Sequence, residues 1–139
     1  FDETEEALYN NLKTRADACE HLKNDGAVII FPAGAISLAP KLIGDAVDGE
    51  WKTFVAKLAQ MPGTTTIPFY FDGCNSLLYQ MARRISVTLG YSLMFREICK
   101  KMGHTISIKM RQPIDASVLS QFSNRAEMTH YLRKCTYGS

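Results

Sequence analysis

The residues of this chain whose types and spacing could support chemistry lie in one stretch, GAVIIFPAGAIS, residues 26–37. Four apolar residues lead into Phe31 and Pro32, and small, flexible residues follow. This pattern predicts a strand over residues 27–31, buried on both faces, and then a loop. In open α/β sheets, ligands bind at such loops because free backbone N–H groups lie beyond the carboxyl ends of the strands. The loop is a candidate site for an anion or a headgroup, although Gly34 could equally serve a plain turn.

The elements that must position this loop are predicted from hydrophobic periodicity. Gly26 is placed to end the first helix, and Gly103 to end the third. Pro68 cannot donate to a ladder, so it lies at an edge, at a bulge or at the end of its strand. The third helical stretch is too long for one straight rod, and a break is expected at Gly90. The predicted helices span residues 3–24, 51–59, 76–102, 116–122 and 125–135, and the predicted strands span residues 27–31, 64–71 and 105–110.

The order of these elements predicts an α/β fold in which helices cover a mostly parallel or mixed sheet. The length of 139 residues fits one domain, and no internal repeat or linker divides the chain. A composition of 46% hydrophobic and 22% charged residues is typical of a globular protein. We therefore expect a single domain over residues 1–139.

The net charge of +2 is unevenly distributed. Residues 1–50 carry ten acidic and four basic side chains, whereas residues 73–114 carry seven basic and one acidic. The basic middle could meet lipid headgroups, phosphates or an acidic carrier protein, or its Lys and Arg could simply solubilise the outer faces of amphipathic helices. Nucleic-acid binding is not expected, because exposed aromatics do not interleave with the basic residues and the acidic first third would repel phosphates.

The four cysteines, Cys19, Cys74, Cys99 and Cys135, lie far apart, without a C-x-x-C pair or nearby histidines. We interpret them as free thiols in a reducing cytoplasm, with a disulfide framework as the alternative. Neither a metal site nor a cofactor is predicted. No apolar run approaches the roughly 20 residues of a membrane-spanning helix.

Several blocks, in order, resemble the glycerolipid acyltransferase superfamily, and most closely its haemolysin-like branch, which includes ornithine-lipid acyltransferases. The resemblance covers residues 22–114. The blocks are FPAGAIS, WKTFVAKLAQ, TIPFYFDGCNSLLYQ and FREICKKMGHTISIKMRQPI. The resemblance implies an acyltransferase-like α/β fold that is incomplete in this chain, which would be the C-terminal portion of the domain.

The superfamily shares an F-P-E-G-T-R-S loop that binds the acceptor, and later a V-P-[IVL] block. Here Ala33 replaces the glutamate and Ile36 the arginine, so the charged contacts to a phosphate are missing. Cys74 likewise replaces the arginine of a G-R-N-S turn. The acceptor-binding residues implied by the resemblance are Phe31, Pro32, Ala33, Gly34, Ser37, Pro68 and Asn75.

The family's catalytic H-x-x-x-x-D motif is absent. In that motif the histidine is the general base and the aspartate orients the imidazole. His21 and Asp25 are one residue too close together, so we interpret His21 as a surface histidine. His104 and His130 come too late in the chain, and no catalytic residue is assigned. The chain begins at Phe1 within a helical pattern, as expected of a piece cut from a longer protein, and the resemblance implies that the base would then lie upstream.

The resemblance implies transfer of a fatty acyl group from acyl-ACP or acyl-CoA to a lyso-lipid acceptor. The enzyme would be cytoplasmic and peripheral to the inner face of the membrane, with the surface around residues 83–101 touching the bilayer or an acidic acyl carrier. The alternative is a non-catalytic lipid- or protein-binding module with the same fold. An incomplete sheet should also leave an exposed strand edge or apolar face, and so favour self-association.

Overall fold

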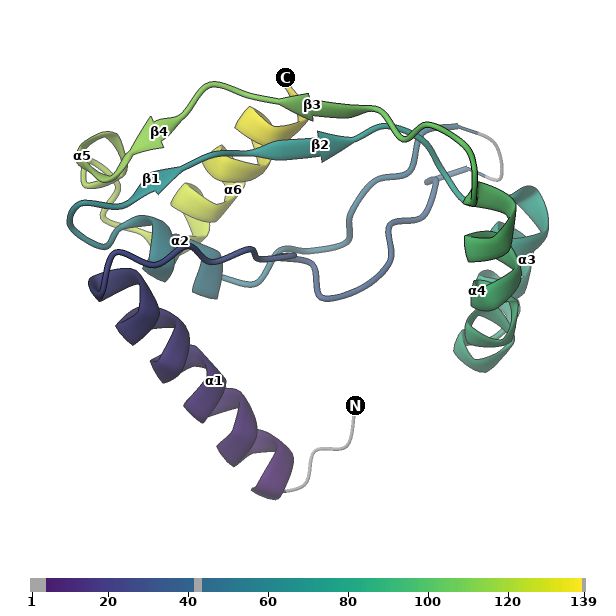
Figure 1. The fold of residues 1–139 in the computed structure, drawn as a ribbon, viewed down its shortest axis with the longest axis horizontal. Helices are drawn as coiled ribbons and strands as arrows, with labels where there is room; N and C mark the ends of the chain where they lie inside the picture. The colour runs from purple at the N-terminus through teal and green to yellow at the C-terminus, as the bar shows by residue number, and fades with distance from the viewer. Residues whose placement is uncertain (1–4, 42–43, 139) are drawn as a thin grey trace.

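The computed structural model describes residues 5–41 and 44–138, and it combines helices with two small sheets (Figure 1). The architecture is broadly α/β, as predicted. The helices are α1 (Glu5–Lys23), α2 (Phe54–Ala59), α3 (Leu77–Ile85), α4 (Val87–Lys101), α5 (Ala116–Leu119) and α6 (Arg125–Tyr137). The strands are β1 (Thr65–Thr66), β2 (Phe69–Phe71), β3 (Ile108–Met110) and β4 (Ile114–Asp115).

Strand pairing differs from the mostly parallel sheet that the element order predicted. Both ladders in the described ranges are antiparallel: β1 pairs with β4, and β2 with β3. The physical reason is the path of the chain after β2. Residues 72–107 leave and return at the same end of the strands, where the Asp72 N–H donates to the Ser107 carbonyl at 3.0 Å. Strands β3 and β4 therefore run back along β2 and β1 (Figure 1).

Pro68 lies between β1 and β2, outside both strands, which agrees with the expected end of a strand. The proline ring is buried, and its carbonyl accepts the Arg111 N–H at 2.9 Å. The predicted strand over residues 64–71 is thus two short strands, and the one predicted over residues 105–110 is shortened to β3.

The predicted buried strand over residues 27–31 is wrong in two respects. The segment belongs to neither ladder, and side chains of Ile29 and Phe31 are 87% and 73% exposed. The alternation of side-chain burial expected of a strand is present, since Val28 and Ile30 are half-buried between exposed neighbours. The segment is unpaired because β1 and β2 form their ladders with β4 and β3 instead.

The core lies between α2, α6 and the β4–α5 corner. Ile30 and Trp51 pack against it from the segments that flank the candidate loop. Its buried residues are Val55, Ala56, Ala59, Ile114, Leu119, Met128 and Leu132. Packing of α2 against α6 therefore supports the segments that carry and flank this loop.

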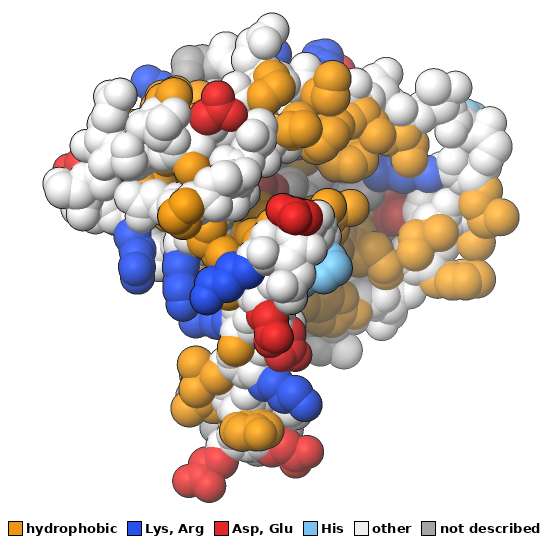
Figure 2. All heavy atoms as spheres, turned by 60° about the vertical axis from the view of Figure 1, so that its left-hand side comes forward, with side chains coloured by type: hydrophobic (Ala, Val, Ile, Leu, Met, Phe, Trp, Pro, Cys, Tyr) orange, Lys and Arg blue, Asp and Glu red, His pale blue; other side chains and the backbone are white. Residues whose placement is uncertain are grey.

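Helix α1 agrees with the helix predicted over residues 3–24, of which residues 3 and 4 lie outside the described part of the chain. It projects away from the body (Figures 1 and 2). Leu8 and Leu12 are exposed, whereas Cys19 and Leu22, nearer the body, are half-buried. The Arg15 guanidinium lies 5.2 Å from the centre of the Phe54 ring, so the second half of α1 is anchored beside α2.

The predicted helix break at Gly90 is also wrong. The chain breaks at Ser86, which is extended (φ −155°, ψ 138°) between α3 and α4. Gly90 is buried inside α4, at a point where α3 comes close. A Cβ built on Gly90 would lie 2.6 Å from Arg83 Cδ and 3.3 Å from the Arg83 Cα. The absence of a side chain thus allows the two helices to pack closely.

Gly90→Ala is expected to destabilise the protein by about 1–2 kcal/mol, although alanine favours a helix interior by about 1 kcal/mol. The added methyl group would force α3 away from α4, because one of its neighbours is backbone. Urea unfolding measures the effect. Ser92→Ala, at an exposed position of the same helix, is the control and should change stability little. A Gly90→Ala protein as stable as this control would contradict the packing role.

Several local predictions are confirmed. Gly103 lies just after α4 with φ +77°, as expected of a glycine that ends a helix. Helix α6 covers the helix predicted over residues 125–135. All four cysteines are free. None of the helices in the described ranges has the length and apolar character needed to cross a bilayer.

Candidate functional site

The candidate loop begins with a tight turn. The Phe31 carbonyl accepts the Gly34 N–H at 3.0 Å, and Gly34 has φ +61°. A Cβ built on Gly34 would meet no atom within 4 Å. The backbone conformation, and not crowding, therefore favours glycine here, and the space beside the turn is open.

The loop is fixed on both sides of this turn. The Pro32 carbonyl accepts the Lys52 N–H at 2.9 Å. Leu38 and Val47 form an antiparallel bridge, with N–H to carbonyl distances of 3.3 and 3.0 Å. The Ser37 hydroxyl donates to Asp48 Oδ1, just beyond this bridge.

Asp48 joins the loop to the core and to α6. Its Oδ2 accepts the Trp51 Nε1–H at 2.8 Å, and its backbone N–H donates to the Tyr137 hydroxyl at 2.9 Å. Its carbonyl accepts Arg133 Nη2 at 2.6 Å. Burial raises the pKa of Tyr137, so its phenol stays neutral near pH 7. Sequence reasoning missed Asp48, which lies in a loop without periodicity.

A second set of hydrogen bonds ties the loop to α3. The Ala39 N–H donates to Gln80 Oε1 at 3.2 Å, and the Ala39 carbonyl accepts Arg84 Nη2 at 2.6 Å. Gln80 and Ala39 are both buried. The loop is thus held between α6 and the α3–α4 hairpin.

The other two predicted site residues have separate partners. Pro68 is buried at the β1–β2 junction, whereas Asn75 precedes α3 and accepts Lys101 Nζ at 2.9 Å. Within the described ranges, no hydrogen bond joins Pro68 or Asn75 to residues 31–37. The structure therefore groups Phe31, Pro32, Ala33, Gly34 and Ser37 in one loop, and hydrogen bonding does not link the remaining pair to it.

Glu97 is a buried acid that sequence reasoning did not single out. Its Oε2 accepts the Ser76 N–H at 2.7 Å, and its Oε1 accepts the Ser76 hydroxyl at 2.6 Å. Burial alone would raise the pKa of Glu97, but the Ser76 bonds, with Lys100 and Lys101 nearby, hold that pKa below its usual 4.5. Ser76 also caps α3 by accepting the Tyr79 N–H at 3.4 Å. This cluster fixes the segment that carries Asn75.

The three histidines are all exposed, which agrees with the interpretation of His21 as a surface residue. The His21 ring lies over Gly26 at the end of α1. Within the part of the chain that the structure describes, no three His, Cys, Asp or Glu side chains are placed to hold a metal ion.

Two surface hollows lie away from the loop. One, of about 590 Å³, lies between α1 and α2, and the other, of about 340 Å³, lies between α6 and the β3–β4 region. The first is lined by Ala16, Cys19, Glu20, Lys23, Asn24 and Lys57. The candidate loop lines neither of these two hollows.

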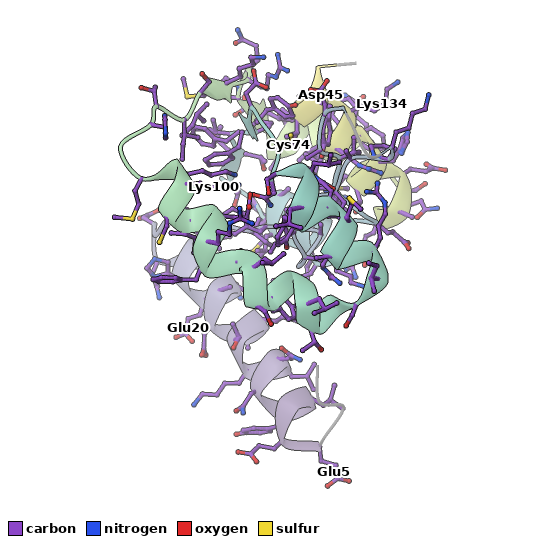
Figure 3. All side chains as sticks on the ribbon, turned by 90° about the vertical axis from the view of Figure 1, so that its right-hand side faces the viewer. Glu5, Glu20, Asp45, Cys74, Lys100 and Lys134 are labelled. Carbon is purple, nitrogen blue, oxygen red and sulfur yellow. The ribbon has the colours of Figure 1, made fainter. Side chains whose placement is uncertain are left out.

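The α3–α4 hairpin carries an apolar and basic surface. Figure 3 looks onto it, with Lys100 on α4 and Cys74 just before α3 at the same end. Its exposed large apolar residues are Leu77, Leu78, Met81, Ile85, Val87, Leu89, Tyr91, Phe95 and Ile98. Its basic residues are Arg83, Arg84, Arg96, Lys100 and Lys101. This surface suits an anionic, partly apolar partner.

Comparison of the chain with protein-family models, with curated proteins and with solved structures found no match.

Proposed function

We propose that this chain is the C-terminal portion of an acyltransferase domain that transfers a fatty acyl group from acyl-ACP or acyl-CoA to a lyso-lipid acceptor. The observation that carries the proposal is the turn from Phe31 to Gly34. It is anchored on both sides, open beside Gly34, and formed by the residues that resemble the family's acceptor loop.

The acceptor would be held by backbone groups. Among the described residues, no hydrogen bond uses the N–H groups of Ala33, Ala35 or Ile36, so they are available to oxygen atoms of a headgroup. Neither Ala33 nor Ile36 supplies a charge. A neutral or zwitterionic acceptor therefore suits the loop better than one with a free phosphate.

The chemistry needs a base from polypeptide outside these 139 residues. That base would take the proton of the acceptor hydroxyl or amine, whose oxygen or nitrogen bonds to the thioester carbonyl carbon. The carrier thiolate would leave and be reprotonated. The α3–α4 surface would rest on the inner face of the membrane or on an acidic carrier, and no cofactor is required.

The test compares the 139-residue chain with a longer polypeptide that includes the residues encoded upstream. Transfer of labelled acyl groups from acyl-ACP or acyl-CoA to lyso-lipids is the readout. We expect transfer by the longer polypeptide and none by the 139 residues alone. Turnover by the short chain, or its absence from the longer one, would contradict the proposal.

Gly34→Ala is expected to cost about 1–2 kcal/mol of stability, because a Cβ is unfavourable at positive φ. The same variant should weaken lyso-lipid binding by distorting the turn. Gly49→Ala is the matched control, since Gly49 is also exposed, its Cβ would meet nothing within 4 Å, and its φ is not positive. Equal stability and binding in both variants would remove the turn from the proposal.

The alternative of a non-catalytic binding module is favoured by one observation. The Ser37 hydroxyl is engaged by Asp48 and is not free for a substrate. That module would bind lyso-lipid or a partner protein through the same loop, and the longer polypeptide would bind without transferring acyl groups.

A further inference from the structure

The first half of α1 carries an uncovered row of side chains. Glu5, Leu8 and Leu12 follow one another at spacings of three and four residues, so they share one face of the helix. Leu8 and Leu12 are 61% and 55% exposed, because this half of α1 projects beyond the body of the protein (Figure 2). The same face is anchored further along the helix, where Cys19 is half-buried. We call Glu5, Leu8 and Leu12 the α1 row.

A second uncovered row follows α4. It consists of Tyr91, Phe95, Ile98 and Lys101, which recur at spacings of three and four residues and therefore share one face. All four are exposed, and Phe95 most of all, at 76% among the apolar three. The Lys101 ammonium donates to the neutral side chain of Asn75 at 2.9 Å, so this contact leaves its charge in place. We call these four residues the α4 row.

The two rows lie in regions of opposite charge. Residues 5–12 contain two acidic and no basic side chains, and among the described residues neither Glu5 nor Glu6 has an ion-pair partner. Figure 2 shows acidic side chains at the tip of α1. Residues 77–101 contain five basic side chains and one acid, Glu97, which is buried against Ser76. Each row therefore has an exposed apolar surface and the charge that the other lacks.

The rows also match in order when the two helices run antiparallel. From the N-terminal end of α1 the order is an acid and then apolar residues, and from the C-terminal end of α4 it is a cation and then apolar residues. Glu5 then lies beside Lys101. Leu8 lies against Ile98, because each is three residues further along its helix. The same alignment sets the two helix dipoles antiparallel, which is the favourable arrangement.

We propose that the α1 row of one copy of this chain packs antiparallel on the α4 row of a second copy, and that a two-fold axis repeats the contact. In Figure 1, α1 and the α3–α4 hairpin project from the same side of the two sheets, so one partner meets both rows. A second copy is the occupant because it supplies both missing surfaces at once. A bilayer with anionic headgroups would cover the basic row but repel the acidic one.

The contact goes beyond the proposed acyl transfer and does not depend on it, because neither row includes a residue of the candidate loop. It covers α4 and leaves the exposed apolar side chains of α3 to a membrane or a carrier. These are Leu77, Leu78, Met81 and Ile85.

Sedimentation equilibrium of the 139-residue protein up to about 0.5 mM tests the contact, since a Kd near 0.1 mM would then give mostly dimer. Glu5→Lys or Lys101→Glu alone should raise the Kd at least about fivefold, because like charges would meet at both contacts of the dimer. The two substitutions together exchange the charges, and should return the Kd to within about twofold of the wild-type value. Glu20→Lys, exposed on the anchored half of α1, is the matched control and should change the Kd less than about twofold.

A second pair of variants tests the apolar part of the contact. Phe95→Ser should raise the Kd at least about tenfold, because two large side chains are lost from each dimer. Ile85→Ser is the matched control, since Ile85 is also 76% exposed but lies on α3, and it should change the Kd less than about twofold. Circular dichroism checks that each variant is folded.

A protein that stays monomeric up to about 0.5 mM would overturn the proposal. Association that the exchange of charges does not restore would also overturn it, because the α1 row and the α4 row would then not be in contact. A monomer that binds phosphatidylglycerol vesicles, and loses that binding in Phe95→Ser, would assign the α4 row to a bilayer instead.

Discussion

Glu97→Ala is expected to lower the free energy of unfolding by about 3 kcal/mol, the largest loss among the substitutions considered for this chain. Glu97 is only 4% exposed, and its carboxylate accepts two hydrogen bonds from Ser76. Each hydrogen bond to a charged group contributes about 1.5–3 kcal/mol, and removing the acceptor also leaves the Ser76 donors without a partner. Denaturant unfolding, followed by circular dichroism, measures the effect.

Two matched variants separate the charge from the shape. Glu97→Gln keeps the volume and one acceptor, and should lose about half as much stability as Glu97→Ala. Lys100→Ala removes a 3.8 Å ion pair to Glu97 in which the lysine side chain is 46% exposed, and should cost less than about 0.5 kcal/mol. If Glu97→Ala were no worse than Lys100→Ala, the buried cluster would not hold α3 to α4.

The same cluster should make stability depend on pH. The folded pKa of Glu97 lies below its usual 4.5, so its contribution is fully present above that value. The contribution is lost as the pH falls through the lower, folded pKa. Wild-type protein should thus lose stability on acidification more steeply than Glu97→Gln, in which this group no longer titrates.

The features that the sequence predicts correctly are set by neighbouring residues. Helix α1 ends before Gly26, as expected, although the residue with positive φ is Asp25 (56°) and not the glycine. Helix α3 starts after Ser76 because a serine hydroxyl can cap a helix. Pro68 interrupts a ladder because it lacks an N–H. Each of these outcomes depends on chemistry within a few residues.

The features that the sequence does not predict depend on distant partners. The apolar run at residues 27–31 has the composition of a buried strand, but burial requires neighbouring strands, and β1 and β2 take theirs from β4 and β3. Gly90 weakens a helix locally, yet it lies inside α4, where Arg83 of α3 packs against it. A single sequence contains no direct record of such pairings.

The candidate site shows the same division. The turn at Gly34 follows from local residue types, whereas its anchors lie far away in sequence. Asp48 bonds to Tyr137 and Arg133, which are more than 80 residues away. No periodicity marks Asp48, so neither the anchor nor the position of the loop relative to α6 could be predicted.

Asp48→Ala is expected to cost about 2–3 kcal/mol, the second largest loss. The substitution removes the acceptor of the Ser37 hydroxyl and of the Trp51 indole N–H, both half-buried. The hydrogen bonds that the Asp48 backbone makes with Tyr137 and Arg133 can remain, so the lost stability measures the contribution of the carboxylate alone. Two hydrogen bonds to a charged acceptor at about 1.5 kcal/mol each give this magnitude. Thermal unfolding and the fluorescence of Trp51, the single tryptophan, follow it.

Ser37→Ala and Asp48→Asn complete the Asp48 series. Ser37→Ala removes one of the two bonds and should cost about 1 kcal/mol, without changing the environment of Trp51. Asp48→Asn keeps one acceptor, and its loss of stability should lie between those of Ser37→Ala and Asp48→Ala. Because Ser37 belongs to the candidate loop, all three should weaken lyso-lipid binding in the same order as they lose stability. Loss of stability with unchanged binding would make Asp48 a structural anchor of residues 37–51 and would separate the loop from the acceptor site.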